Sequence, residues 1–222
     1  MDLDTFLRNI SIKVIPVLLA ITLHEVAHGW MARYFGDRTA ELLGRLSLNP
    51  LRHIDPIGTL LVPGLLLAFG GPMFGWAKPV PVATSALRNP RRATLMVALA
   101  GPAANILMAL AWGAVLAAIA RVNGNQTLDY WIALMAQAGI VVNVILAVLY
   151  LLPIPPLDGA RVLSVFLPSR SSAHLAKFEP FGLYVVAILA VLPASQPVFL
   201  VLFSPVFHGM GHFIKALMDT TA

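Results

Sequence analysis

The chain contains no cysteine and few charged residues. Asp, Glu, Lys and Arg make up 11% of its 222 residues, whereas a typical soluble domain has about 25%. The absence of cysteine excludes disulfides and thiolate ligands, so any bound metal ion must be held by His, Asp or Glu. Because 59% of the residues are apolar, the composition indicates a protein that lies in the lipid bilayer.

The net charge is +5, from 15 Lys and Arg against 10 Asp and Glu. In a membrane protein such an excess reflects topology and anionic headgroups, so we expect contact with lipid and no nucleic-acid partner. No polar stretch is long enough for a second folded module, and we expect a single membrane-embedded domain over residues 1–222. The acidic start "MDLD" argues against a cleavable signal peptide.

Long apolar runs dominate the rest of the chain. A transmembrane helix needs about 20 predominantly apolar residues. We therefore predict an α-helical integral membrane protein, a polytopic bundle with helices at about residues 14–34, 94–120, 131–153, 178–192 and 198–218. The run at 178–192 is short and spans a bilayer only with tilt or local thinning.

Residues 37–90 differ in character, because Gly, Pro, Asn and Asp interrupt short apolar pieces. These residues are turn and strand signals, and they predict a small β and re-entrant region. We expect short strands near residues 40–48 and 80–83, and a re-entrant or interfacial segment at residues 57–69.

Lys and Arg predict the topology, because they are enriched in cytoplasmic loops. Most of them lie after the first predicted helix, before the second and after the third, whereas residues 121–130 hold only Arg121. We therefore expect the N-terminus outside the cytoplasm and residues 33–55 inside. The first and third helices then run inward and the second runs outward.

The stretch "ITLHEVAHGW" places two histidines and a glutamate inside the first apolar run. In a helix His24 and His28 lie on one face, a turn apart, where two imidazoles can bind one metal ion. Glu25 lies at the neighbouring edge, where its carboxylate can reach a metal-bound water without ligating the metal. Ionisable residues in a membrane helix are costly and usually mark a functional site. The pattern predicts a metal-dependent hydrolase with Glu25 as general base.

A third ligand must come from elsewhere, because catalytic zinc usually has three protein ligands and one open position. The strongest candidate is Asp158 in "LLPIPPLDGARVL", just after the third predicted helix. The prolines end that helix and favour extended backbone, and the topology places Asp158 near the depth of both histidines. The alternative is that Asp158 only caps a short helix that starts at Gly159.

Several motifs together resemble a known family. "HEVAHG", "AGPAANILMAL" and "LPIPPLDGARVL", with "GRLSLNPLRHIDPIGTLL" and "FGWAKPVPV" between them, are similar to the site-2 protease family of zinc intramembrane metalloproteases, in a compact bacterial form without a PDZ or CBS module. The resemblance implies a three-helix catalytic core in the bacterial cytoplasmic membrane and cleavage of transmembrane segments of membrane-protein substrates. It also implies one catalytic Zn²⁺, with His24, His28 and Asp158 as ligands and Glu25 as base.

One position departs from the family pattern N-x-x-P-x-P-x-L-D-G, which would place Asn where this chain has Tyr150. Candidates for substrate or oxyanion support are therefore Asn143, Asn105 and the Tyr150 hydroxyl. For the two asparagines, hydrogen bonding between helices is the alternative. A strand at residues 39–48 would offer the unwound substrate an edge for β-addition.

Other polar residues leave alternatives open. His208 and His212 repeat the four-residue spacing without a carboxylate, so they could form a second metal site, pack between helices or serve an accessory role. His53 and Asp55 fit either a metal contact or a turn before proline.

Two rival functions use the same residues. Intramembrane histidines and a carboxylate are equally natural in a metal-ion transporter, although a transporter has no need of a base that does not ligate. A metal-binding pseudoprotease that acts as a scaffold is the other alternative, and the Tyr150 departure favours it slightly.

Overall fold

The structure is a computed structural model of the chain and describes residues 3–62, 64–65, 76–121, 126–182, 185 and 196–219. Within these ranges, four helices are long and apolar enough to cross a membrane. They are α1 (Leu3–Tyr34), α4 (Pro90–Ile119), α5 (Gln126–Tyr150) and α9 (Gln196–Asp219). The predicted class, a polytopic α-helical membrane protein, is confirmed.

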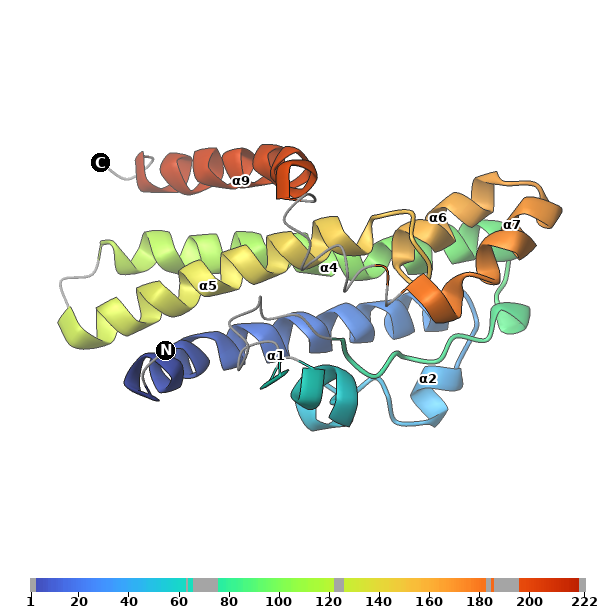
Figure 1. The fold of residues 1–222 in the computed structure, drawn as a ribbon, viewed down its shortest axis with the longest axis horizontal. Helices are drawn as coiled ribbons and strands as arrows, with labels where there is room; N and C mark the ends of the chain where they lie inside the picture. The colour runs from blue at the N-terminus through green and yellow to red at the C-terminus, as the bar shows by residue number, and fades with distance from the viewer. Residues whose placement is uncertain are drawn as a thin grey trace.

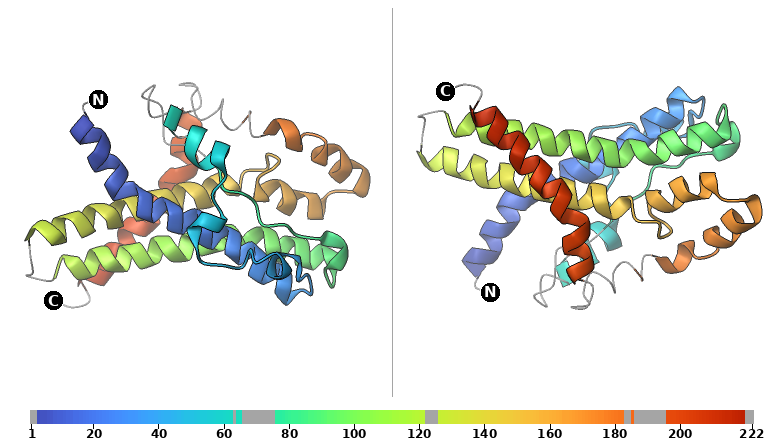
Figure 2. Two further views of the ribbon diagram at one scale, coloured as in Figure 1. Left: turned by 90° about the horizontal axis from the view of Figure 1, so that it is seen from below. Right: turned by 90° about the horizontal axis from the view of Figure 1, so that it is seen from above.

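The long helices form three layers. Helices α4 and α5 run side by side in opposite directions (Figure 1). Helix α1 packs on one face of this pair and α9 crosses the other face obliquely (Figure 2). Three short helices lie toward one end of the bundle: α2 (Thr39–Leu42), α6 (Asp158–Phe166) and α7 (Ser169–Ala176). The start of α1 and the end of α9 lie at the other end, as do the end of α4 and the start of α5.

Small residues allow the inner helices to approach closely. In lipid there is little hydrophobic drive between helices, so close packing of small side chains holds them together. The buried face of α4 follows a four-residue period, with Ala93, Val97, Gly101, Asn105, Ala109, Gly113 and Ala117. The buried face of α5 is similar, with Ala136, Gly139, Ile140, Asn143, Val144 and Ala147.

The helices extend beyond the apolar runs that predicted them. Helix α1 begins at Leu3, well before the predicted start near residue 14, because the apolar run marks only its membrane-crossing part. The short helix α7 was not predicted, since it lies outside the apolar runs, whereas α6 matches the short helix that the sequence offered as an alternative at Gly159. Most of the helix predicted at 178–192 lies outside the described residues.

The predicted strands are wrong for both described segments. Residues 40–48 begin with helix α2, in which Thr39 donates its backbone N–H and hydroxyl to Asp37, and the chain then turns at Gly44 with a φ of +64°. Residues 80–83 are extended but pair with no described strand. Proline lacks the N–H that a ladder needs, and this segment is interrupted at Pro81. The edge expected for β-addition at residues 39–48 therefore does not exist.

The segment predicted to be re-entrant begins with a π-helical turn, η2 (Pro56–Leu61). Asp55 starts this turn by accepting hydrogen bonds from the N–H groups of Ile57 and Gly58. The turn that the sequence offered for Asp55 therefore forms. Residues 66–69 of the predicted segment lie outside the described part of the chain.

Asp37 ties the loop after α1 to the segment before α4. Its carboxylate accepts from Thr39 N at 2.9 Å, Thr39 Oγ1 at 2.5 Å and Ala83 N at 2.7 Å. Burial raises the pKa of Asp37, but these donors outweigh burial and hold the pKa below its ordinary value. The charged carboxylate is thus the form that the fold stabilises.

We predict that Asp37→Asn lowers the free energy of unfolding near neutral pH by about 1 to 3 kcal/mol, because the amide loses the charge that three donors share. A carboxyl whose pKa is lowered by folding adds stability above its unfolded pKa, and that stability is lost as the pH falls through the folded pKa. Thermal unfolding in detergent should therefore show a difference between wild type and variant at about pH 7 that narrows toward about pH 3. A difference that does not depend on pH would contradict this account.

The bundle end that carries α2, α6 and α7 should face the cytoplasm, because Lys and Arg gather in its loops. The chain has no native cysteine, so single cysteines can be labelled with a membrane-impermeant reagent. A cysteine at Asp4 should react only from outside, and a cysteine at Arg38 only from the cytoplasmic side. The reverse pattern would show that the topology is inverted.

Candidate metal centre

Three buried side chains from distant parts of the sequence meet inside the bundle. His24 and His28 lie one turn apart on α1, and their Nε2 atoms are 3.0 Å from each other. Asp158, the first residue of α6, places Oδ2 3.2 Å from each Nε2. The structure thus brings together the three residues that the sequence predicts as metal ligands.

The hydrogen bonds of the histidines assign their tautomers. His24 Nδ1 lies 2.6 Å from Asn105 Oδ1, and His28 Nδ1 lies 2.7 Å from the Val97 carbonyl oxygen. Both partners are acceptors, so each Nδ1 carries the proton and each Nε2 presents a lone pair. The Asp158 Oδ2 that faces them has no hydrogen-bond partner. Three electron pairs therefore point at one another in a buried space, which is favourable only when a cation lies among them.

The dimensions of this triangle fit a metal ion. A tetrahedral zinc ion with bonds of about 2.0 to 2.2 Å holds its ligand atoms about 3.3 to 3.6 Å apart, close to the 3.0 and 3.2 Å seen here. Gly101 of α4 leaves the room, because a Cβ there would lie 2.5 Å from His28 Nε2 and 2.6 Å from His24 Nε2. Two imidazoles and one carboxylate also form a donor set typical of catalytic zinc.

Asp158 is not a helix cap. The N-cap of α6 is Leu157, and no side chain caps this helix. Its carboxylate instead faces the two imidazoles, with Oδ2 3.2 Å from each Nε2.

Glu25 lies beside the triangle and does not belong to it. Its side chain is buried, and Oε2 accepts a hydrogen bond of 2.7 Å from the backbone N–H of Val80. No described residue bonds the other carboxylate oxygen. Glu25 therefore has the placement that a non-ligating base requires, next to His24 with one oxygen available.

Two buried asparagines form a chain behind His24. Asn105 Nδ2 donates to Asn143 Oδ1 at 2.9 Å, and Asn143 Nδ2 donates to the Gly139 carbonyl oxygen at 2.8 Å. The chain joins α1, α4 and α5, which matches the interhelical alternative for both residues. In this structure their amides face the bundle and hold the His24 ring.

Tyr150 packs on the site itself. Its ring lies 4.2 Å from the His24 ring, centroid to centroid, at an angle of 43°. The residue that departs from the family pattern therefore contacts a predicted ligand directly.

The remaining histidines do not join the triangle. His53 is buried, and its Nε2 bonds to the Ser47 carbonyl oxygen at 2.8 Å, so it holds a turn. His208 and His212 are exposed on α9, where His208 Nδ1 bonds to the Ser204 carbonyl oxygen at 2.8 Å. Among the described residues, the group able to hold a metal ion consists of the two α1 histidines and the α6 aspartate.

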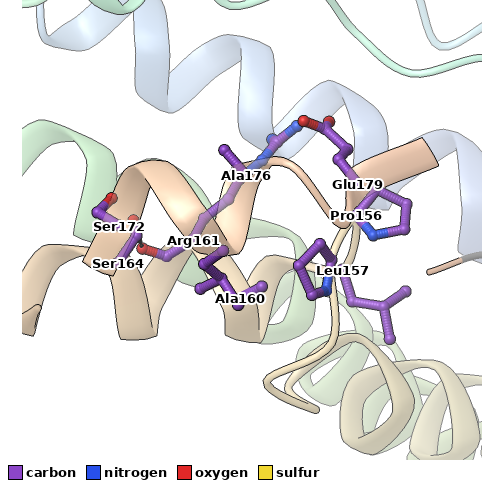
Figure 3. A pocket seen from close by; sticks show the side chains of 10 residues that line it. Pro156, Leu157, Ala160, Arg161, Ser164, Ser172, Ala176 and Glu179 are labelled. Atoms are coloured by element: carbon purple, nitrogen blue, oxygen red, sulfur yellow. Dashed lines mark hydrogen bonds between the residues drawn. The ribbon is translucent and has the colours of Figure 1, made fainter. Parts of the chain in front are cut away.

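A cavity of about 130 Å³ lies between α6 and α7, beside the turn that precedes Asp158 (Figure 3). Pro156 and Leu157 line it, and the side chains of Arg161 and Glu179 point toward one another. None of the three predicted ligands lines this cavity. It is therefore separate from the triangle.

Sequence reasoning missed three groups that shape the site: the Val97 carbonyl, Gly101 and the Val80 N–H. The sequence pattern could have identified Gly101, since it falls in the row of mostly small residues that repeats every four positions on α4. No pattern could have identified the two backbone groups, because any residue supplies them.

Comparisons with known proteins find relatives that are all named as putative zinc metalloproteases. A protein of Bacillus subtilis (strain 168) named "Putative zinc metalloprotease YwhC" is 36% identical over 193 residues, which cover 82% of this chain and 81% of that protein. "Putative zinc metalloprotease Rip2" of Mycolicibacterium smegmatis is 33% identical over 177 residues, 80% of this chain and 65% of that protein. Rip2 of Mycobacterium tuberculosis (strain H37Rv) is 32% identical over 176 residues, which cover 79% of this chain and 65% of that protein. No protein-family model and no solved structure matches the chain.

We predict that Asn105→Ala weakens zinc binding about 10- to 100-fold, the usual cost of losing a group that orients a ligating histidine. Competition with a chromophoric chelator measures the affinity. Gln137→Ala, which removes an exposed amide from α5, is the matched control and should bind zinc like wild type. Equal affinities in the two variants would show that the asparagine chain does not orient His24.

Proposed function

Because the chain belongs to the site-2 protease family of zinc metalloproteases, we propose that it is an intramembrane endopeptidase that cleaves transmembrane segments of membrane-protein substrates. The observation that carries the proposal is the buried meeting of His24, His28 and Asp158, with Glu25 beside them, inside a bundle of membrane-crossing helices. The bacterial relatives support a location in the bacterial cytoplasmic membrane.

The residues divide the chemistry between them. His24, His28 and Asp158 would hold one zinc ion, which would act as a Lewis acid and lower the pKa of a bound water. Glu25 takes a proton from the attacking water and passes it to the nitrogen of the leaving amine. The buried setting keeps bulk water away, so each charge acts more strongly on the reacting groups.

The substrate class follows from the location of the site. A transmembrane helix hides its peptide groups in its own hydrogen bonds, so the substrate must unwind before a carbonyl can reach Glu25 and the triangle. Both histidines lie in the last third of α1, toward the bundle end that carries the short helices. We infer that cleavage occurs near that end of the substrate helix.

The test uses purified protein in lipid vesicles with a model transmembrane substrate. Wild type should cleave it, and Glu25→Gln should lower kcat by about 10²- to 10⁴-fold, the usual contribution of a general base. Glu25→Gln should still bind one zinc ion per chain, because Glu25 is not a ligand. Asp158→Ala should lose both zinc and cleavage.

Each rival function has its own outcome in this experiment. A zinc-loaded wild type that cleaves no transmembrane substrate would indicate a pseudoprotease. Movement of zinc into vesicles, detected with an enclosed dye, would indicate a transporter. Wild-type turnover by Glu25→Gln would remove the base from the mechanism.

A further inference from the structure

The extended segment of residues 76–83 runs beside α1 and reaches the catalytic glutamate. In an extended chain, backbone N–H groups point to one side at every second residue. Trp76 donates to the Gly58 carbonyl and Lys78 to the His53 carbonyl, both at 3.0 Å. Val80 continues this alternation, but its N–H meets Glu25 Oε2 at 2.7 Å.

The prolines around Val80 make its N–H unusual. Pro79 and Pro81 have no N–H, so Val80 carries the one backbone donor in the stretch 79–81. Each proline also fixes its own φ and restricts the residue before it to extended conformations. The backbone that presents this donor is thus rigid, and no neighbouring N–H competes for the carboxylate.

Both flanks of the segment are anchored. Arg45 Nη2 donates to the Lys78 carbonyl oxygen at 2.7 Å, and Ala83 N donates to Asp37 Oδ2 at 2.7 Å. Val80 is itself buried, with 6% of its surface exposed. The donor that meets Glu25 is therefore held by bonds on each side of it.

We propose that the Val80 N–H is a positioning group for the general base. It binds Oε2 and thereby fixes the Glu25 side chain in the rotamer that leaves Oε1 available to the attacking water. The proposal rests on the proposed function for its effect on turnover, but the contact itself can be tested without zinc and without substrate.

The kinetic test compares two Val→Pro variants of the same segment. Val80→Pro removes the donor. Val82→Pro is the matched control, because Val82 also follows a proline and its N–H donates no hydrogen bond among the described residues. Val80→Pro should lower kcat about 10- to 100-fold, as misplacement of a catalytic group does, with KM and zinc affinity near wild type. Val82→Pro should keep wild-type kcat. Equal values of kcat in the two variants would overturn the proposal.

A second form of the test covers the case in which Val80→Pro does not fold. Replacing Val80 by its α-hydroxy acid turns one amide into an ester, which deletes the N–H and keeps the side chain. The ester variant should show the same fall in kcat with normal zinc binding. Wild-type turnover by the ester variant would equally overturn the proposal.

The activity-independent test measures exchange of the Val80 amide hydrogen by NMR in zinc-free protein labelled with ¹⁵N-valine. Glu25→Ala should speed exchange at Val80 at least about tenfold, because the acceptor is lost. Glu25→Gln should leave it slow, since the amide oxygen still accepts. Unchanged exchange in Glu25→Ala would overturn the contact. If wild type cleaves no substrate, the proposed function fails, while this measurement still decides whether Val80 holds Glu25.

Discussion

The meeting of three unshared electron pairs, from His24, His28 and Asp158, is the constraint on which the rest of the structure depends. Burying three acceptors face to face costs free energy unless a cation lies among them. The helices must therefore be held together well enough to keep the donors in place before any ion binds. Small residues along α4 and α5 provide this close packing, and in lipid such packing replaces the hydrophobic effect that holds soluble bundles together.

The row of buried residues that packs α4 against its neighbours also shapes the metal site. Val97, Gly101 and Asn105 are successive members of the four-residue row. The first accepts from His28, the second leaves room beside both Nε2 atoms, and the third accepts from His24. A change that shifts α4 along α1 would therefore disturb both histidines at once. The residues that pack the bundle are also the residues that set the tautomers of the ligands.

The sequence predicted the parts of this arrangement that follow from helix geometry and topology. His24, Glu25 and His28 could be placed from the helical period, and Asp158 from the prolines that end α5. The strands expected at residues 40–48 and 80–83 were wrong because local groups decided the backbone: Asp37 engages Thr39 at the start of α2, and Pro81 cannot donate to a ladder. The contact between Val80 and Glu25 joins residues 55 positions apart through a backbone group, and no periodicity or residue type signals such a contact.

The metal ligands and the base on α1 are held by different parts of the structure. Successive residues on a helix differ by about 100° in direction, so Glu25 and His24 point to different sides of α1. The histidines are held by α4 within the bundle, whereas the glutamate is held by residues 76–83, which belong to a connecting segment. That segment is itself fixed by bonds from Arg45 to the Lys78 carbonyl and from Ala83 to Asp37. The base and the metal ligands are therefore held in place by separate sets of hydrogen bonds.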